Sequence, residues 1–281
     1  MAFSKLLRTT LAAMGCLMVP ATASASDRQF AYTYNTSTIA PGQLELEPWT
    51  TFRIGRDDFY FRTDHRFELE TGFTDSLQGS IYFNVSATTE QTRPAGATQS
   101  VRETEVEWEG VSLELKGKLS DAVADPVGFG LYFEPTITPT EGEVEVKALL
   151  DKRAGDFYFA YNLVGEWEIE FGAPGEAEHE FVLEHDLGLA GYVREDVTLG
   201  GEVRNVSLFE LGEGFESSTF FAGPAVSFRQ KRFFATASIT PQIFSISGEE
   251  EEEEEEEEGD SSLDLEHHER LSARLIVGFE L

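Results

Sequence analysis

Apolar and polar residues alternate along most of the chain, and the alternation is clearest in its last eleven residues. One face of this segment carries Ser272, Arg274, Gly278 and Glu280, with Ile276 as the one apolar exception. The apolar face consists of Leu271, Ala273, Leu275, Val277, Phe279 and Leu281. A period of two predicts a strand, and alternation up to the last residue is typical of the closing strand of an outer-membrane β-barrel.

Similar alternating segments follow one another from residue 43 onward without a convincing helix. Their number predicts an all-β fold, a transmembrane antiparallel up-and-down β-barrel of about twelve strands. A barrel of about ten strands remains open, because the segments 143–150 and 197–209 alternate less regularly. The predicted strands are 43–54, 59–70, 77–87, 101–119, 127–138, 143–150, 157–171, 177–193, 197–209, 218–230, 232–247 and 263–281.

The segment 101–119 changes phase in its middle. Val106 and Trp108 occupy one parity, whereas Val111 and Leu113 occupy the other. A β-bulge at Glu109-Gly110 would insert one residue and keep all four side chains on the same face.

The two longest predicted connections fall on the same side of the barrel. If the N-terminus is periplasmic, the two longest, 88–100 and 248–262, both lie outside the cell. This agrees with the rule of short periplasmic turns and longer external loops.

The first 25 residues have the features of a secretory signal peptide. Lys5 and Arg8 precede an apolar run, 10–19, which is too short to span a bilayer as a helix, and an A-x-A site ends at Ala25. An alternative is a lipoprotein cleaved before Cys16, but the preceding Ala-Met-Gly is a poor lipobox. Cleavage after Ala25 leaves a mature chain without cysteine, and so without disulfides.

The rest of the chain divides into two parts. We expect residues 26–42 to form a periplasmic lead-in, in which Phe30, Tyr32 and Tyr34 alternate, and which can tuck into the barrel mouth. Residues 43–281 form the barrel.

Composition agrees with a membrane barrel and limits its partners. The net charge is -31, and removing Lys5 and Arg8 with the signal makes it -33, which argues against binding nucleic acid. Hydrophobic residues make up 41% of the chain, and 23 residues are Phe. A secreted β-sandwich also alternates, but here the polar face is dense in charge, as expected of a lumen.

The charged residues on the polar face are the candidate functional residues. We expect these lumen-lining charges to be Arg53, Arg62, Asp64, Arg66, Glu145, Lys147, Glu166, Glu168, Glu184, Arg270 and Arg274. They predict a channel or transporter for small cationic or neutral solutes. The alternative is a non-transporting structural or surface-interaction barrel, whose lumen is plugged by Arg–Glu and Lys–Glu networks, and the sequence favours neither.

Ten consecutive glutamates, Glu249 to Glu258, lie on a predicted external loop. Such a run is usually a solvated, self-repelling loop, although it could bind divalent cations weakly. Together with His267 and His268 it gives only weak metal candidates, because the spacing of a known metal site is absent. Two further histidines, His65 and His185, would face lipid.

An outer-membrane lipase with a Ser–His pair on the outer wall is a third hypothesis. No G-x-S-x-G motif is present, and no candidate serine stands out from the others. The sequence therefore predicts no enzyme and no cofactor. The serines considered are Ser86, Ser112, Ser207 and Ser227.

Five segments resemble a family of uncharacterised outer-membrane β-barrel proteins of Gram-negative bacteria, classed as a domain of unknown function. The resemblance implies a barrel integral to the outer membrane, in contact with its lipid and inserted by the barrel-assembly machinery, and it implies no activity. The segments are F-A-Y-T-Y (30–34), D-P-V-G-F-G-L-Y-F-E-P (125–135), A-Y-N-L-V-G-E-W-E (160–168), G-P-A-V-S-F-R (223–229) and R-L-I-V-G-F-E-L (274–281).

Overall fold

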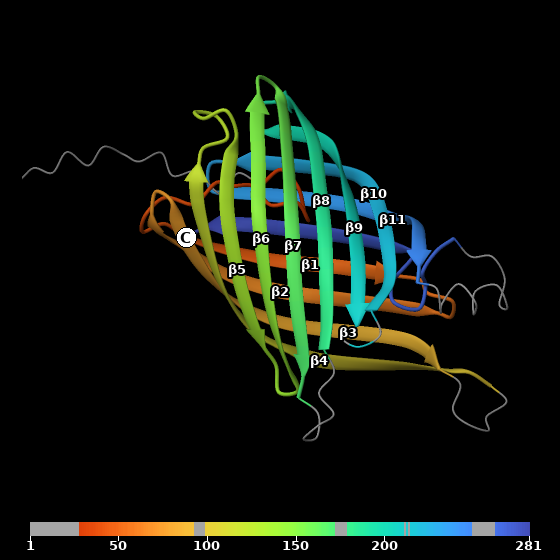
Figure 1. Cartoon of the computed structure of the whole chain (residues 1–281). Helices are drawn as coiled ribbons and strands as arrows, with labels where there is room; N and C mark the ends of the chain where they lie inside the picture. Colours follow the sequence, from red (N-terminus) through yellow and green to blue (C-terminus); the bar gives the residue numbers. More distant parts are fainter. Residues whose placement is uncertain (1–27, 93–98, 172–178, 211, 213, 249–261) are drawn as a thin grey trace, which may run out of the picture.

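The described part of the chain forms one closed antiparallel barrel, in which every strand pairs with its neighbours in sequence and β1 pairs with β12 (Figure 1). The structure is a computed structural model that describes residues 28–92, 99–171, 179–210, 212, 214–248 and 262–281. The strands are β1 (Leu44–Ile54), β2 (Tyr60–Thr74), β3 (Leu77–Thr92), β4 (Val101–Ser120), β5 (Gly128–Ile137), β6 (Glu141–Ala154), β7 (Phe157–Glu170), β8 (His179–Arg194), β9 (Val197–Glu210), β10 (Gly214–Gln230), β11 (Phe233–Ser247) and β12 (Leu271–Glu280).

The twelve strands of the described chain confirm the predicted fold, and the alternative count of about ten is wrong. The two less regular segments are β6 and β9. Each pairs along its length with both neighbours, as at Val144, which lies opposite Pro135 on one side and Trp167 on the other. The predicted signal peptide, 1–25, and the glutamate run, 249–258, lie outside the described residues.

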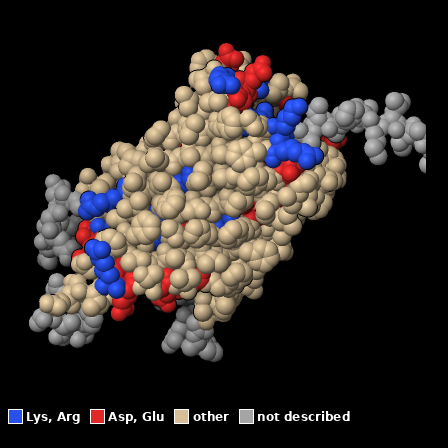
Figure 2. All heavy atoms as spheres, turned by 180° about the vertical axis from the view of Figure 1, so that it is seen from behind, with Lys and Arg blue, Asp and Glu red and all other residues tan. Residues whose placement is uncertain are grey.

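The outer wall of the barrel is apolar. Phe67, Trp108 and Leu131 each leave about half of their surface exposed, at 50%, 50% and 51%. Figure 2 shows a wall made mostly of uncharged residues, with most of the visible charged side chains at its two ends. A soluble protein rarely exposes so continuous an apolar surface, so this wall is suited to lipid. No helix among the described residues is long and apolar enough to cross a membrane.

The two histidines on this outer face each have a polar neighbour on the adjacent strand. His65 Nδ1 lies 3.2 Å from Thr50 Oγ1, and His185 Nδ1 lies 2.7 Å from the hydroxyl of Tyr161. A neutral imidazole can share a hydrogen bond with a hydroxyl group, which lowers the cost of facing an apolar medium. The predicted phase of these strands therefore needs no change.

The phase shift within β4 is a β-bulge, as predicted. Gly110 has a φ of 83°, and the register between β3 and β4 shifts between Phe83 and Val85. Trp108 and Leu113 are both exposed on the outer wall. Glycine adopts this positive φ without strain, and it lets the two halves of the strand present apolar side chains on one side.

Most connections at one end of the barrel are two-residue turns, and the longest connections lie at the other end, as predicted. Four of the short turns contain two residues each: 75–76, 155–156, 195–196 and 231–232. The longest connection at the opposite end spans 248–270. These two ends are called the short-turn end and the long-loop end below.

The last strand begins later than predicted, at Leu271 instead of residue 263. The carboxylate of Asp264 accepts hydrogen bonds from the backbone N of His267 (3.0 Å) and from Ser217 Oγ (2.9 Å). These bonds turn the chain inward and bury Leu265. Residues 262–270 are therefore a mouth loop, although Leu263 and Leu265 alternate with polar residues as a strand would.

The hydrophobic core lies inside the barrel. It joins aromatic residues of the wall to residues that precede β1, and a main cluster contains Tyr32, Tyr34, Trp49, Tyr132 and Phe234. The segment before β1 therefore occupies the lumen.

Candidate functional site

Residues 28–41, called the N-terminal plug here, cross the lumen and bind to its wall through their backbone. The carboxylate of Glu202 on β9 accepts hydrogen bonds from the backbone N–H groups of Ala31 (3.1 Å), Tyr32 (2.9 Å) and Thr33 (2.7 Å). The Ser238 hydroxyl on β11 also donates to Glu202. One buried carboxylate thus satisfies three consecutive backbone donors.

The next part of the plug binds two further strands. Tyr34 N donates to Asn162 Oδ1 (2.6 Å), and Asn162 Nδ2 donates back to the Tyr34 carbonyl (3.0 Å). Thr36 donates through its N (3.0 Å) and its Oγ1 (2.8 Å) to the carboxylate of Asp151. Asn162 lies on β7 and Asp151 on β6.

The plug ends against the β2–β3 hairpin at the short-turn end. Ile39 N donates to Gln78 Oε1 (3.1 Å), and Thr38 Oγ1 donates to the carbonyl of Asp75 (3.0 Å). Because the plug contacts strands on several sides of the barrel at this end, it fills the lumen there.

Aromatic side chains of the plug fill the space between its backbone and the wall. Phe30 lies over Gly188, where an added Cβ would be 2.5 Å from the ring. Tyr34 packs edge-on against Tyr132, with ring centroids 5.2 Å apart. The guanidinium carbon of Arg28 lies 4.2 Å from the centre of the Tyr34 ring, a cation–π contact.

A cavity of about 660 Å³ remains above the plug, towards the long-loop end. Tyr32 and Tyr34 of the plug form part of its lining, and residues 266–269 of the mouth loop lie at its rim. The cavity is charged on nearly all sides: twelve Asp and Glu residues line it, against seven Lys and Arg residues.

The two signs of charge occupy opposite walls. Arg53, Arg62, Arg66 and Arg274 come from β1, β2 and β12, where Asp64 is the single acidic lining residue. The facing wall, β6 to β8, supplies Lys147 and seven acidic residues. These are Glu141, Glu143, Glu145, Glu166, Glu180, Glu184 and Asp186. In a closed barrel of twelve strands β7 lies opposite β1, so a field crosses the cavity.

Several lining charges form ion pairs. Arg62 lies between Asp64 (2.6 Å) and Glu109 (2.8 Å), and Arg66 pairs with Glu134 (3.2 Å). Other pairs are Arg53–Asp64, Arg204–Glu184 and Lys147–Glu145. Glu143 and Glu166 form no salt bridge with any described Lys or Arg, so the acidic wall keeps an excess of negative charge.

The structure places most of the predicted lumen charges around this cavity. Glu168 lies in the same cross-strand row as Glu143 and Glu180. Arg270 precedes β12, at the barrel mouth, and its Nη2 is 3.8 Å from Asp57. The predicted residues that line the cavity are Arg53, Arg62, Asp64, Arg66, Glu145, Lys147, Glu166, Glu184 and Arg274.

The mouth loop holds the weak metal candidates His267 and His268. His267 Nδ1 lies 3.2 Å from Asp264, and His268 packs edge-on against Phe221. Burial alone would raise the pKa of Asp264, but hydrogen bonds from His267 hold that pKa well below its usual value. Burial lowers the pKa of His268 to about 4. Glu249 and Glu258 lie outside the described residues.

Three of the four serines considered for a lipase, Ser86, Ser112 and Ser227, point into hydrogen-bond networks of the lumen. Ser207 lies between Val206 and Leu208, which line the cavity, and therefore points to the outer face. Ser86 donates to Glu109, Ser207 shares a hydrogen bond with Ser218, and Ser227 donates to the carbonyl of Arg28. Ser112 Oγ accepts a hydrogen bond from Asn84 Nδ2 and shares another with the Thr136 hydroxyl. In the described chain none of these hydrogen bonds reaches a histidine.

Comparison with known proteins gives a family and a fold. A family of unknown function, DUF6662, matches residues 22–148 and 161–281. The chain belongs to this family. The predicted resemblance to an uncharacterised barrel family is thereby confirmed. No curated protein matches the sequence.

Two solved outer-membrane structures resemble this DUF6662 barrel. The COG4313 outer membrane channel from Pseudomonas putida F1 has a TM-score of 0.54 at 11% identity, over 88% of this chain and 98% of that one. The NanC porin has a TM-score of 0.53 at 11% identity, over 84% of this chain and 100% of that one. At this identity the likeness shows the fold, which is that of outer-membrane barrels.

Proposed function

We propose that this protein is an outer-membrane channel for small cationic solutes, and that its N-terminal plug holds it closed in the conformation described here. The observation that carries the proposal is the division of the lumen. Residues 28–41 fill its short-turn end, while a charged cavity of about 660 Å³ remains at the long-loop end.

The way in which the plug is attached supports a removable gate. Its backbone donors bind side chains such as Glu202, Asn162 and Asp151, and not the strand ladders. Among the described residues, the plug forms one isolated β-bridge, between Pro41 and Gly72. Water can replace a side-chain acceptor when the plug leaves, and the barrel wall keeps all of its own hydrogen bonds.

The charge of the cavity supports cationic solutes. Acidic residues outnumber basic ones by twelve to seven in the lining, and Glu143 and Glu166 are without a salt bridge in the described chain. A narrow passage with excess negative charge concentrates cations and repels anions. The sequence also allows neutral solutes, but the negative charge of this wall gives them no preference over cations.

A permanently plugged, non-transporting barrel is the second candidate. The observation in its favour is the burial of Phe30, Tyr32 and Tyr34, each no more than 5% exposed, in the barrel core. Both functions place the protein in the outer membrane, without enzymatic activity, and with the barrel-assembly machinery as its insertion partner.

Conductance in planar bilayers separates the two candidates. We expect the full-length protein to open rarely, and a variant lacking residues 28–41 to show large, stable, cation-selective steps. The variant must first show the heat-modifiable gel migration of a folded barrel. A folded variant that stays as closed as the full-length protein would support the plugged, non-transporting barrel instead.

A further inference from the structure

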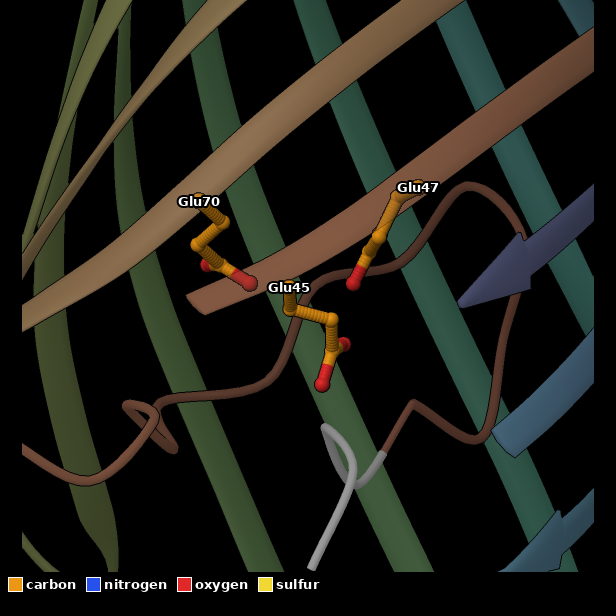
Figure 3. A group of neighbouring side chains, drawn as sticks. All are labelled: Glu45, Glu47 and Glu70. Atoms are coloured by element: carbon orange, nitrogen blue, oxygen red, sulfur yellow. The ribbon is translucent and has the colours of Figure 1, made fainter. Parts of the chain in front are cut away.

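A second group of charges, separate from the cavity, lies at the short-turn end of the lumen. Five glutamates, Glu45, Glu47, Glu68, Glu70 and Glu114, project inward from β1, β2 and β4, and none is more than 4% exposed. Figure 3 shows Glu45, Glu47 and Glu70 pointing toward one another beside the chain that leads into β1.

The strand register brings these glutamates together. Glu45 lies opposite Glu70, which lies opposite Ser80, which in turn lies opposite Glu114. The next inward row places Glu47 opposite Glu68. Alternation with a period of two sends all of these side chains into the lumen.

Two groups of three carboxylates have ligand atoms within 4.8 Å of one another, and they share Glu70. One group is Glu45, Glu47 and Glu70, and the other is Glu68, Glu70 and Glu114. Two oxygens bound to one Ca²⁺ at 2.3–2.6 Å are at most about 5 Å apart, so each group has a spacing that a single ion can span.

Among the described residues, few positive charges lie next to this cluster. Arg28 of the plug pairs with Glu47 at 3.3 Å. Lys116 is buried on β4, and its ammonium group forms no salt bridge within the described chain. Burying five carboxylates beside two cations is costly unless protons or another cation enter.

Unpartnered polar atoms give an independent indication of a ligand. Ser80 is 9% exposed and Glu68 is 2% exposed. The Ser80 hydroxyl oxygen and Glu68 Oε2 are both buried, they lie near each other, and neither forms a hydrogen bond of standard distance and angle with a described residue. A buried oxygen left without a partner is destabilising, and a cation between these groups would remove that cost.

We infer that this cluster, called the Glu70 cluster, binds a divalent cation, and that the cation is Ca²⁺. All available donors are oxygens, which calcium accepts in sets of six to eight with flexible geometry. Magnesium requires shorter distances of about 2.0–2.1 Å in a near-ideal octahedron, whereas zinc prefers nitrogen and sulfur ligands, which this cluster lacks.

The site also adjoins the N-terminal plug. Arg28 reaches Glu47, while Gln78 accepts from Ile39 N and donates through Nε2 to Glu114 (3.3 Å). Ca²⁺ bound at Glu70 therefore strengthens the end of the lumen where the plug is anchored.

Thermal unfolding of the full-length protein in detergent, after treatment with a chelator, tests this inference. We expect CaCl₂ to raise the Tm by several degrees in a saturable manner, and MgCl₂ at equal concentration to raise it less. The Glu70→Gln variant removes the shared ligand and loses the calcium-dependent shift. The control Glu166→Gln, on the opposite wall, keeps it.

Two outcomes overturn the inference. One is the absence of a saturable calcium shift in the wild-type protein, which would mean that the cluster is neutralised by protons. The other is an equal shift in Glu70→Gln, which would assign the binding to other carboxylates, such as the run 249–258. Ser80→Ala, which keeps every charge, is expected to weaken calcium binding several-fold by calorimetry. Thermal unfolding and calorimetry do not depend on whether the protein conducts ions, so these tests are independent of the channel proposal.

Discussion

The two halves of the lumen differ in what their charged walls contact. At the short-turn end, Glu202 and Asp151 are buried and accept hydrogen bonds from the backbone of the plug. At the long-loop end, Glu143 and Glu166 face an open cavity. Both sets arise from the same alternation of apolar and polar residues. The presence of another segment of the chain, and not the composition of the wall, decides whether a carboxylate closes the lumen or lines a passage.

We expect the largest change in channel behaviour, a rise in open probability, from a substitution that weakens the binding of the plug at the short-turn end. Glu202→Ala removes the acceptor of three plug N–H groups, which then remain buried without partners. A loss of about 3 kcal/mol in plug binding would raise the open probability about 100-fold in single-channel recordings.

The matched control for this variant is Glu166→Gln. Glu166 lines the open cavity, and none of the hydrogen bonds described above joins it to the plug. Its open probability should equal that of the wild-type protein. A Glu202→Ala barrel that is folded and opens no more often would show that these three bonds do not hold the plug.

We expect a smaller effect, on ion selectivity, from substitutions in the wall of the open cavity. In a channel lacking the plug, Glu143→Gln with Glu166→Gln lowers the negative charge of the cavity without leaving an arginine unpaired. We expect the cation-to-anion permeability ratio, measured from reversal potentials in a salt gradient, to fall roughly twofold or more. An unchanged ratio would mean that selectivity is set elsewhere.

We expect the smallest effect from the mouth loop, where the stability of the protein depends on pH through His268. Burial lowers the pKa of His268 to about 4, near Asp264, Glu269, His267 and Arg204. The unfolded chain, with an ordinary histidine pKa of about 6.5, therefore binds the extra proton first as pH falls. Stability is therefore lost progressively as the pH falls from about 6.5 to about 4.

Thermal unfolding as a function of pH measures this loss. His268→Asn lacks the titrating group, so its Tm should change less than that of the wild-type protein in the same interval. Parallel curves for the two proteins would indicate that His268 does not control the pH response of the mouth loop.

The barrel itself was predictable because a period of two is a local signal. The bulge at Gly110 followed from the change of parity between Trp108 and Val111. The same signal failed at Leu263 and Leu265, where Asp264 forms hydrogen bonds with residues distant in the sequence. Alternation cannot distinguish a strand from a short loop held by such bonds.

The site was predictable only in part. The pattern assigns a residue to the inner or outer face, and it therefore found Arg62, Glu166 and other lining charges. It does not identify the partner across the lumen, so the roles of Glu202 and Asn162 were missed. The alternating Phe30, Tyr32 and Tyr34 were the one local sign of the plug.

The most direct test of the account is a disulfide that fixes the plug to the wall. A Cβ at Gly130 would lie 3.6 Å from that of Thr36, within the range for a disulfide. The single cysteine of the sequence, Cys16, is in the predicted signal peptide, so Thr36→Cys with Gly130→Cys would introduce the one pair in the mature chain.

Planar-bilayer recordings compare the oxidised and reduced forms of this same double variant. We expect the oxidised form to stay closed, and a reductant to restore openings to the frequency of the wild-type protein. Equal conductance in both forms, with the disulfide confirmed by mass spectrometry, would contradict the claim that the N-terminal plug closes the channel.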